Sequence, residues 1–152
     1  MSNAVFVPPV PINEPIKSYA PGTPERAALQ AEYDRRLKTK IDAPMWIGGK
    51  AITTTNVRKM SPPHKHAHNL GNSHHGDAKS VKSAIDAALK AKRAWETMPY
   101  EDRAAIFLRA ADLLAGPYRA QINAATMLVH CKNAYQAEID AACELIDFLR
   151  FN

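Results

Sequence analysis

One acid near the end of this sequence stands where the helical pattern calls for an apolar side chain. When residues 134–152 are placed on a helical wheel, Glu138 falls nearly opposite Asp140, Glu144 and Asp147, which mark the expected solvent face. The neighbours of Glu138 on the wheel are apolar: Ala134, Ala141, Ala142, Leu145 and Leu149. A carboxylate in such a position needs a specific partner, because burying a bare charge is costly.

Two interpretations of Glu138 stay open at this point. In the first, it forms a buried ion pair with an arginine, for which the candidates are Arg103, Arg109 and Arg119. In the second, it faces a pocket and binds a ligand. The residue pattern alone does not separate a structural acid from a functional one.

The histidines form a second group that could do chemistry. His64, His66 and His68 alternate, which on a strand would place three imidazoles on one face, and two more histidines follow at 74–75. Neutral imidazoles in such an array could bind zinc or copper. Only Asp77 lies nearby to complete a ligand set, and the prolines before His64 are typical of an exposed turn. We therefore predict no metal site.

The two cysteines, Cys131 and Cys143, are the only candidate nucleophilic thiols. Cys131 has His130 beside it, but adjacent side chains seldom point toward one another. Cys143 falls among apolar helix residues, where an inert buried thiol is usual. The sequence also contains no glycine-rich phosphate loop and no nucleophile-elbow or metalloprotease motif. We predict no catalytic residue in this chain.

The composition excludes several functional classes. The net charge is +5, but the basic residues occur in short runs among acids, so we predict no nucleic-acid partner. No uncharged stretch reaches the roughly 18 residues of a membrane span, so no membrane partner is predicted. Two cysteines in one helical region favour a reducing compartment over a secreted disulfide framework.

Composition also changes along the chain, near residue 77. Nine of the eleven prolines and five of the six glycines lie in residues 1–77, whereas 18 of the 26 alanines follow. We therefore divide the chain into residues 1–76, an extension with one helix and short strands, and residues 77–152, a four-helix segment. The first part is predicted to hold a helix from Thr23-Pro24 to Lys38, a hairpin of residues 45–47 and 50–53, and strands at 57–61 and 68–73.

The four predicted helices of residues 77–152 have clear start and stop signals. The first helix would place Val81, Ile85, Ala88 and Trp95 along one face. The fourth is predicted to run to Asn152 without a C-cap glycine, so we expect the chain to be cut short of a complete domain. The boundary signals are Asp77, Pro99, Gly116-Pro117 and the capping-box pair Asn133 and Gln136.

Three segments carry a resemblance to a known family. They are residues 107–117 (FLRAADLLAGP), 123–127 (NAATM) and 136–152 (QAEIDAACELIDFLRFN), with shorter agreements at 13–15, 19–26, 47–50 and 84–95. In these segments the chain resembles the delta-1-pyrroline-5-carboxylate dehydrogenases, also called L-glutamate gamma-semialdehyde dehydrogenases, of the aldehyde dehydrogenase superfamily. The stretch 127–132, MLVHCK, departs from the glycine-containing turn of that family.

The resemblance implies the fold and reaction of the complete enzyme. It implies an α/β aldehyde dehydrogenase fold, of which this chain would be an α+β piece: short N-terminal strands, then mostly helices, without the Rossmann sheet. It further implies NAD-dependent oxidation of glutamate semialdehyde to glutamate in proline catabolism, through a thiohemiacetal and a thioester. The nucleophile, the general base and the cofactor loops would lie beyond Asn152, so this chain alone should bind no NAD and be inactive.

The resemblance also gives expectations for partners and for Glu138. It implies that the glutamate matching Glu138 lies near the aldehyde substrate, where it could meet the substrate's amino group. We expect a small-molecule substrate, a homo-oligomer, and a cytoplasmic enzyme, or a mitochondrial one if the source is eukaryotic. The alternative that the sequence leaves open is a non-enzymatic helical module that binds a partner.

Overall fold

The computed structural model describes residue 5 and residues 7–152, and in this part of the chain six α-helices and five short strands are found. The helices are α1 (Pro24–Lys38), α2 (Ala78–Thr97), α3 (Tyr100–Ala115), α4 (Arg119–His130), α5 (Ala134–Ala137) and α6 (Glu144–Phe151), with a π-helical turn η1 (Glu138–Cys143) between the last two. The strands are β1 (Ile41–Ala43), β2 (Met45–Ile47), β3 (Lys50–Ile52), β4 (Val57–Met60) and β5 (Gly71–His74). Short strands followed by helices give the α+β order that the sequence predicts.

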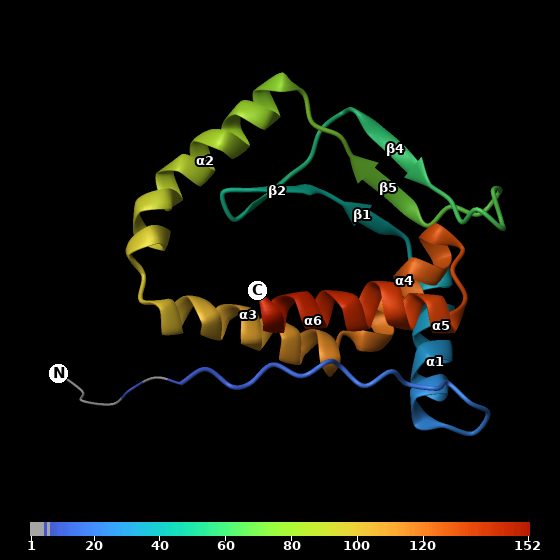
Figure 1. The fold of residues 1–152 in the computed structure, drawn as a ribbon. Coiled ribbons are helices and arrows are strands. Elements are labelled where there is room, and N and C mark those ends of the chain that lie inside the picture. Colours follow the sequence, from blue (N-terminus) through green and yellow to red (C-terminus); the bar gives the residue numbers. More distant parts are fainter. Residues whose placement is uncertain (1–4, 6) are drawn as a thin grey trace.

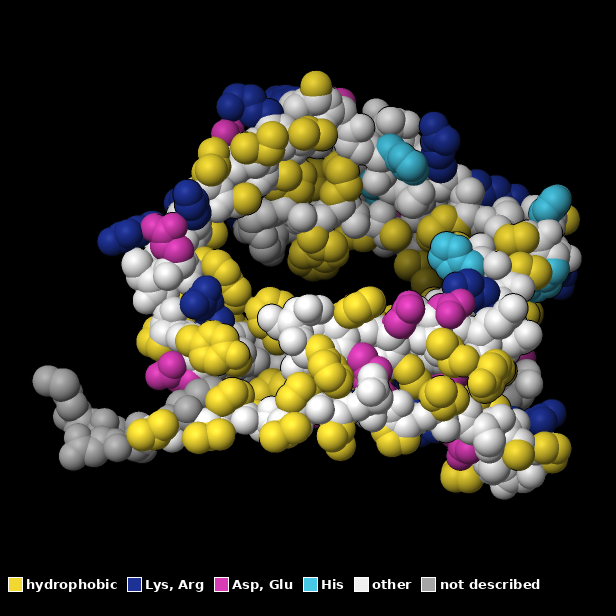
Figure 2. Space-filling view, viewed as in Figure 1, with side chains coloured by type: hydrophobic (Ala, Val, Ile, Leu, Met, Phe, Trp, Pro, Cys, Tyr) yellow, Lys and Arg dark blue, Asp and Glu magenta, His cyan; other side chains and the backbone are white. Residues whose placement is uncertain are grey.

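The elements surround an open space rather than a single core (Figure 1). Helices α3, α4 and α6 form a layer, and the extended N-terminal segment runs along it before it turns into α1. Helix α2 rises from one end of this layer, and the strands lie opposite the layer across the opening. The space-filling view shows the same opening between the strands and the helical layer (Figure 2).

A three-stranded sheet has the order β1-β5-β4, with β1 parallel and β4 antiparallel to the central β5. Strand β1 is not among the predicted strands, because three residues with one exposed acid show no alternation. Strand β5 begins later than predicted: the predicted strand starts at His68, but the backbone N–H of His68 donates to the carbonyl of Lys65 in a turn (2.9 Å). Gly71 is required where the sheet begins, because a Cβ there would lie 1.8 Å from the carbonyl oxygen of Ile41.

The predicted hairpin is confirmed as β2 and β3, which pair antiparallel from Met45↔Ile52 to Ile47↔Lys50. The two-residue turn consists of Gly48 and Gly49, whose φ angles of +59° and +77° suit glycine. The side chain of Trp46, on β2, is 71% exposed. The glycine turn therefore determines the pairing of this hairpin, whereas its side chains bury little apolar surface.

Most helix boundaries follow the predicted signals. The carboxylate of Asp77 accepts the backbone N–H of Ser80 (2.8 Å) and caps α2. Asn133 and Gln136 form the reciprocal capping box that begins α5. Thr23 precedes α1 as predicted, but its hydroxyl donates to the carbonyl of Ala20 (2.8 Å) instead of capping the helix.

The last helix runs from Ala134 to Phe151 as predicted, but its period is not uniform. Between α5 and α6 the chain forms the π-helical turn η1, in which the N–H of Glu144 donates to the carbonyl of Ile139, five residues earlier. A π-turn shifts the phase of the residues that follow it, so a helical wheel of uniform period misplaces some of them. Asp147, predicted to face solvent, instead accepts hydrogen bonds from Asn13 and from the Glu14 N–H.

The buried apolar residues form two small clusters. One joins the first part of the chain to the second, since Tyr19 and Leu29 pack with Ala124 of α4. The other lies within the helical layer, where Ala111, Ala142 and Ile146 meet. The predicted division at residue 77 therefore coincides with a change of secondary structure, while the first cluster is shared by both parts.

Helix α2 buries none of its residues. Its apolar stripe is open to solvent, with Val81 59%, Ile85 54% and Leu89 64% exposed. Figure 2 shows hydrophobic side chains gathered along this helix and around the opening. None of the described helices combines the length and the apolar character needed to cross a bilayer.

The exposed stripe of α2 predicts how the isolated 152-residue chain behaves in solution. Contiguous apolar surface of more than a few hundred Å² promotes association, so the chain should self-associate and bind a hydrophobic dye. Ile85→Gln should weaken both effects, whereas Lys82→Gln on the same helix should leave them unchanged. Sedimentation velocity with dye fluorescence is the measurement, and a compact monomer that binds no dye would contradict the prediction.

Candidate functional site

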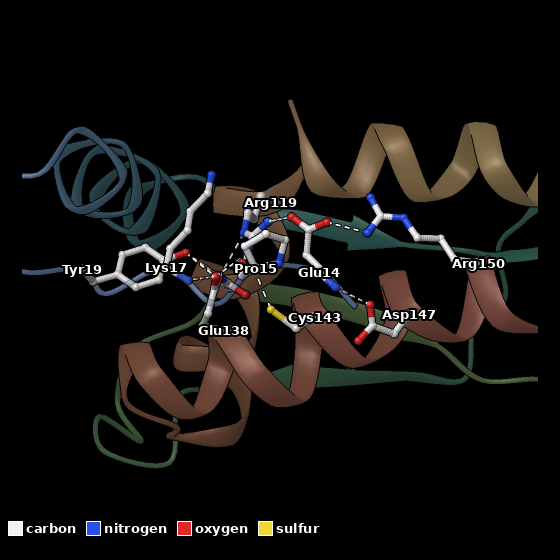
Figure 3. A network of polar contacts seen from close by, with 10 residues as sticks. Glu14, Pro15, Lys17, Tyr19, Arg119, Glu138, Cys143, Asp147 and Arg150 are labelled. Atoms are coloured by element: carbon white, nitrogen blue, oxygen red, sulfur yellow. Dashed lines mark hydrogen bonds and ion pairs between the residues drawn. The ribbon is translucent and has the colours of Figure 1, made fainter. Parts of the chain in front are cut away.

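Glu138 is the centre of a buried polar network (Figure 3). Its side chain is fully buried, and its two oxygens accept five hydrogen bonds from four residues. The Tyr19 hydroxyl donates to Oε2 (2.7 Å), as does Asn123 Nδ2 (2.8 Å). The Lys17 backbone N–H donates to Oε1 (2.8 Å). The remaining two bonds come from the guanidinium of Arg119.

Arg119, at the start of α4, links Glu138 to the N-terminal segment. Its guanidinium forms ion pairs with both Glu138 and Glu14, and its Nη2 also donates to the carbonyl of Pro15 (2.7 Å). The Arg119 side chain is 4% exposed, so this cation is balanced inside the protein by two carboxylates. Such a pair is tolerated only because every charged group in it is also hydrogen bonded.

Glu14 extends the network to the last helix. Its second oxygen accepts a hydrogen bond from Arg150 Nη1 (2.7 Å), and its backbone N–H donates to Asp147 Oδ1 (2.6 Å). Asn13 Nδ2 donates to the other oxygen of Asp147 (2.7 Å). The extended segment before α1 is therefore attached to α4, η1 and α6 by polar contacts that span more than 100 residues of sequence.

The titration behaviour of these groups follows from their contacts. Burial alone would raise the pKa of Glu138, but hydrogen bonds from Arg119, Tyr19, the Lys17 N–H and Asn123 outweigh it and hold that pKa below its usual value. Burial would likewise lower the pKa of Arg119, but its bonds to Glu138 and Glu14 raise it. Burial and the Glu138 charge both raise the pKa of Tyr19. Glu138 and Arg119 are thus both charged at neutral pH.

Local sequence explains how Glu138 reaches this position. The capping box fixes the start of α5, and the π-turn that begins at Glu138 widens the helix where it passes α4. Arg119 and Asn123 lie four residues apart on α4, so both side chains are on one face of that helix and both reach the same carboxylate.

Of the two interpretations of Glu138, the contacts favour the buried ion pair. Its partner is Arg119, and no hydrogen bond joins it to the other two candidate arginines. The substrate-binding role predicted for Glu138 stays a prediction.

Sequence reasoning missed the other members of the network. Tyr19, Asn123 and Glu14 belong to no catalytic or metal-binding motif, although each lies in a segment that carries the family resemblance, and they meet Glu138 and Arg119 only through folding. The residue types did indicate one pair. Glu138 is an acid on an apolar helix face and Arg119 begins another helix, so their opposite charges suit an ion pair. The Lys17 and Pro15 contacts are made by backbone atoms, which side-chain patterns cannot indicate.

The histidines do not converge, and within the described residues no group of three or more His, Cys, Asp or Glu side chains could hold a metal ion. Residues 61–70 form a loop and not a strand, so the alternation of His64, His66 and His68 does not bring their side chains to one face. His68 contacts the carbonyl of Leu37 (2.6 Å), and His74 contacts the Asp42 carboxylate (3.1 Å).

The two cysteines differ in environment. Cys143 is buried beside Arg119, whose Nη2 lies 3.5 Å from its sulfur. Burial, with the nearby Glu138 charge, raises the pKa of the Cys143 thiol to about 11, so this thiol is protonated and inert at neutral pH. Cys131 is exposed, and its partner is His64 rather than the adjacent His130 (Sγ to Nδ1, 3.7 Å).

The chain belongs to the aldehyde dehydrogenase family, whose model matches residues 46–152. The curated relatives that it resembles are delta-1-pyrroline-5-carboxylate dehydrogenases. The protein of Agaricus bisporus is 52% identical over 146 residues, which cover 95% of this chain and 27% of that protein. The mitochondrial enzyme of Mus musculus is 45% identical, with 92% of this chain and 25% of that protein covered. The chain therefore spans about a quarter of the length of these relatives.

Solved structures agree with the sequence relatives. The delta-pyrroline-5-carboxylate dehydrogenase of Mycobacterium tuberculosis, bound with NAD and cobalamin, is 47% identical and superposes with a TM-score of 0.95 over 99% of this chain and 29% of that chain. The 1-pyrroline-5-carboxylate dehydrogenase of Thermus with bound NAD is 28% identical, with a TM-score of 0.85 over 96% of this chain and 28% of that chain. The predicted aldehyde dehydrogenase fold is confirmed.

The buried network predicts a large and specific loss of stability on substitution of Arg119. Arg119→Gln leaves the buried Glu138 carboxylate without its cation, and breaking a buried pair costs about 3–5 kcal/mol. Arg93→Gln is the matched control, because Arg93 forms an exposed pair with Glu96 that contributes about 0–1 kcal/mol. Urea unfolding at low micromolar concentration is the measurement, and equal midpoints for the two variants would contradict the account.

Proposed function

We propose that this chain works as part of a longer NAD-dependent enzyme that oxidises L-glutamate gamma-semialdehyde, the open form of 1-pyrroline-5-carboxylate, to L-glutamate. The observation that carries the proposal is the overlap of 99% of this chain with the Mycobacterium tuberculosis dehydrogenase at 47% identity. A match of this extent supports a shared reaction and substrate class as well as a shared fold. The role in proline catabolism follows from the same substrate.

The described residues do not themselves fit NAD. Dinucleotide sites use a glycine-rich turn between a parallel strand and a helix, with the pyrophosphate at the helix N-terminus. Here parallel pairing is limited to three residues each of β1 and β5. Helix α2, which follows β5, has the Asp77 carboxylate at its N-terminus, where a phosphate would meet a negative charge. We therefore assign no step of hydride transfer to these residues.

The part that we propose for this chain is mechanical support. The network of Glu138, Arg119 and Glu14 fixes the N-terminal segment against α4 and α6, and so sets the position of the helical layer. The exposed stripe of α2 is suited to contact further parts of the same enzyme. That stripe also favours a second candidate function, a non-enzymatic helical module that binds a protein partner.

The activity assay separates these two functions. We expect the complete protein to form NADH from glutamate semialdehyde, and the purified 152-residue chain to form none. A complete protein without this activity would favour the binding module. NADH formation by the purified 152-residue chain would contradict the proposal that the nucleophile, the general base and the cofactor loops lie outside these 152 residues.

A second assay tests Glu138 in the complete enzyme. Glu138→Gln keeps the shape of the side chain but removes the charge, and the Arg119 contacts predict a lower melting temperature with an equal loss of kcat/KM for glutamate semialdehyde and for an aldehyde without an amino group. If Glu138 instead binds the substrate's ammonium group, the loss should be about tenfold to a hundredfold larger for glutamate semialdehyde. That outcome would establish the substrate-binding role predicted from the sequence.

A further inference from the structure

The exposed thiol of Cys131 lies in a small cluster that the proposed enzyme function does not use. Cys131 follows α4, and its sulfur lies 3.7 Å from His64 Nδ1. The other ring nitrogen of His64, Nε2, lies 3.3 Å from the hydroxyl of Tyr33 on α1. Three segments far apart in the sequence thus bring a thiol, an imidazole and a phenol into one chain of contacts.

The contacts fit an imidazole that accepts the thiol proton. When the Cys131 thiol donates to Nδ1, the neutral ring carries its own proton on Nε2 and donates it to the Tyr33 oxygen. After proton transfer the ring donates from both nitrogens, to the thiolate and to the same oxygen, so neither state leaves a ring nitrogen unpaired. The thiolate is the reactive form of cysteine, and His64 Nδ1 lies where it can take up the thiol proton as the sulfur attacks.

A cavity adjoins the cluster and offers room for a small ligand. Its volume is about 340 Å³, and Tyr33 is part of its wall. Met127 and Ala134, which bracket Cys131 in the chain, line it as well. Its polar lining includes the exposed side chain of Arg26, whose guanidinium suits a carboxylate. The cavity therefore offers space and a cation next to Tyr33, the phenol of the cluster.

We propose that Cys131 is a site of reversible thiol–disulfide exchange with a small disulfide that carries carboxylates, of the type of glutathione disulfide. The Cys131 thiol gives its proton to His64 Nδ1, and the thiolate sulfur attacks one sulfur of the disulfide. A new S–S bond to Cys131 forms while the original S–S bond breaks. The departing thiolate takes the proton from His64 and leaves as a thiol, so atoms and electrons balance without a further oxidant.

The chain carries its own control in Cys143, which is buried, whereas Cys131 is exposed. The 152-residue chain is incubated with glutathione disulfide at pH 7, and the modified cysteines are quantified by peptide mass spectrometry. We expect Cys131 to react at least tenfold faster than Cys143, and faster than Cys131 in a synthetic peptide of residues 127–136.

Two variants test the mechanism. His64→Gln should slow the reaction of Cys131 about tenfold, whereas His66→Gln, an exposed histidine of the same loop, should leave the rate unchanged. Denatured chain, in which both cysteines are exposed, gives the reference rate for unstructured thiols. A His64→Gln rate equal to wild type, or a Cys131 rate no higher than that of the peptide, would overturn the proposal.

Discussion

The ion pair between Glu138 and Arg119 is the contact on which the arrangement of this chain depends. Both side chains are buried, so removing either one would leave an uncompensated charge inside the protein and destabilise the fold. The Glu138 carboxylate needs several donors at once, and it takes them from α4 and from the N-terminal segment. Because those donors come from separate parts of the sequence, satisfying one buried charge also determines how the parts sit together.

The polar network compensates for a small apolar core. The two buried clusters contain few large side chains, and α2 contributes none. The N-terminal segment has no regular secondary structure between residues 7 and 20, so helix or sheet hydrogen bonds do not hold it. Its attachment rests on Tyr19 packing and on the contacts of Glu14 and Lys17. We infer that polar contacts with the helices hold most of this segment and that apolar packing adds to them at Tyr19.

The sequence predicted the features that local chemistry determines. Asp77, the Asn133–Gln136 pair and the Gly48-Gly49 turn each act on backbone groups within a few residues, and each has the predicted effect. The acid at 138 was recognised because it interrupts an apolar stripe. What could not be predicted depends on contacts distant in sequence: the parallel pairing of β1 with β5, the exposure of the α2 stripe and the choice of Arg119 as partner. The π-turn also escaped detection, because a wheel assumes one period throughout.

The dependence of the fold on this ion pair can be measured by amide hydrogen exchange at Lys17, because its N–H donates to the buried Glu138 carboxylate although no secondary structure surrounds it. We expect this amide to exchange far more slowly than an unstructured one, and Arg119→Gln to lower its protection more than that of the α3 amides. The amide of Ser18, an exposed residue whose N–H is not part of the network, serves as the reference. Exchange of the Lys17 amide at the unstructured rate in the wild-type chain would contradict the account.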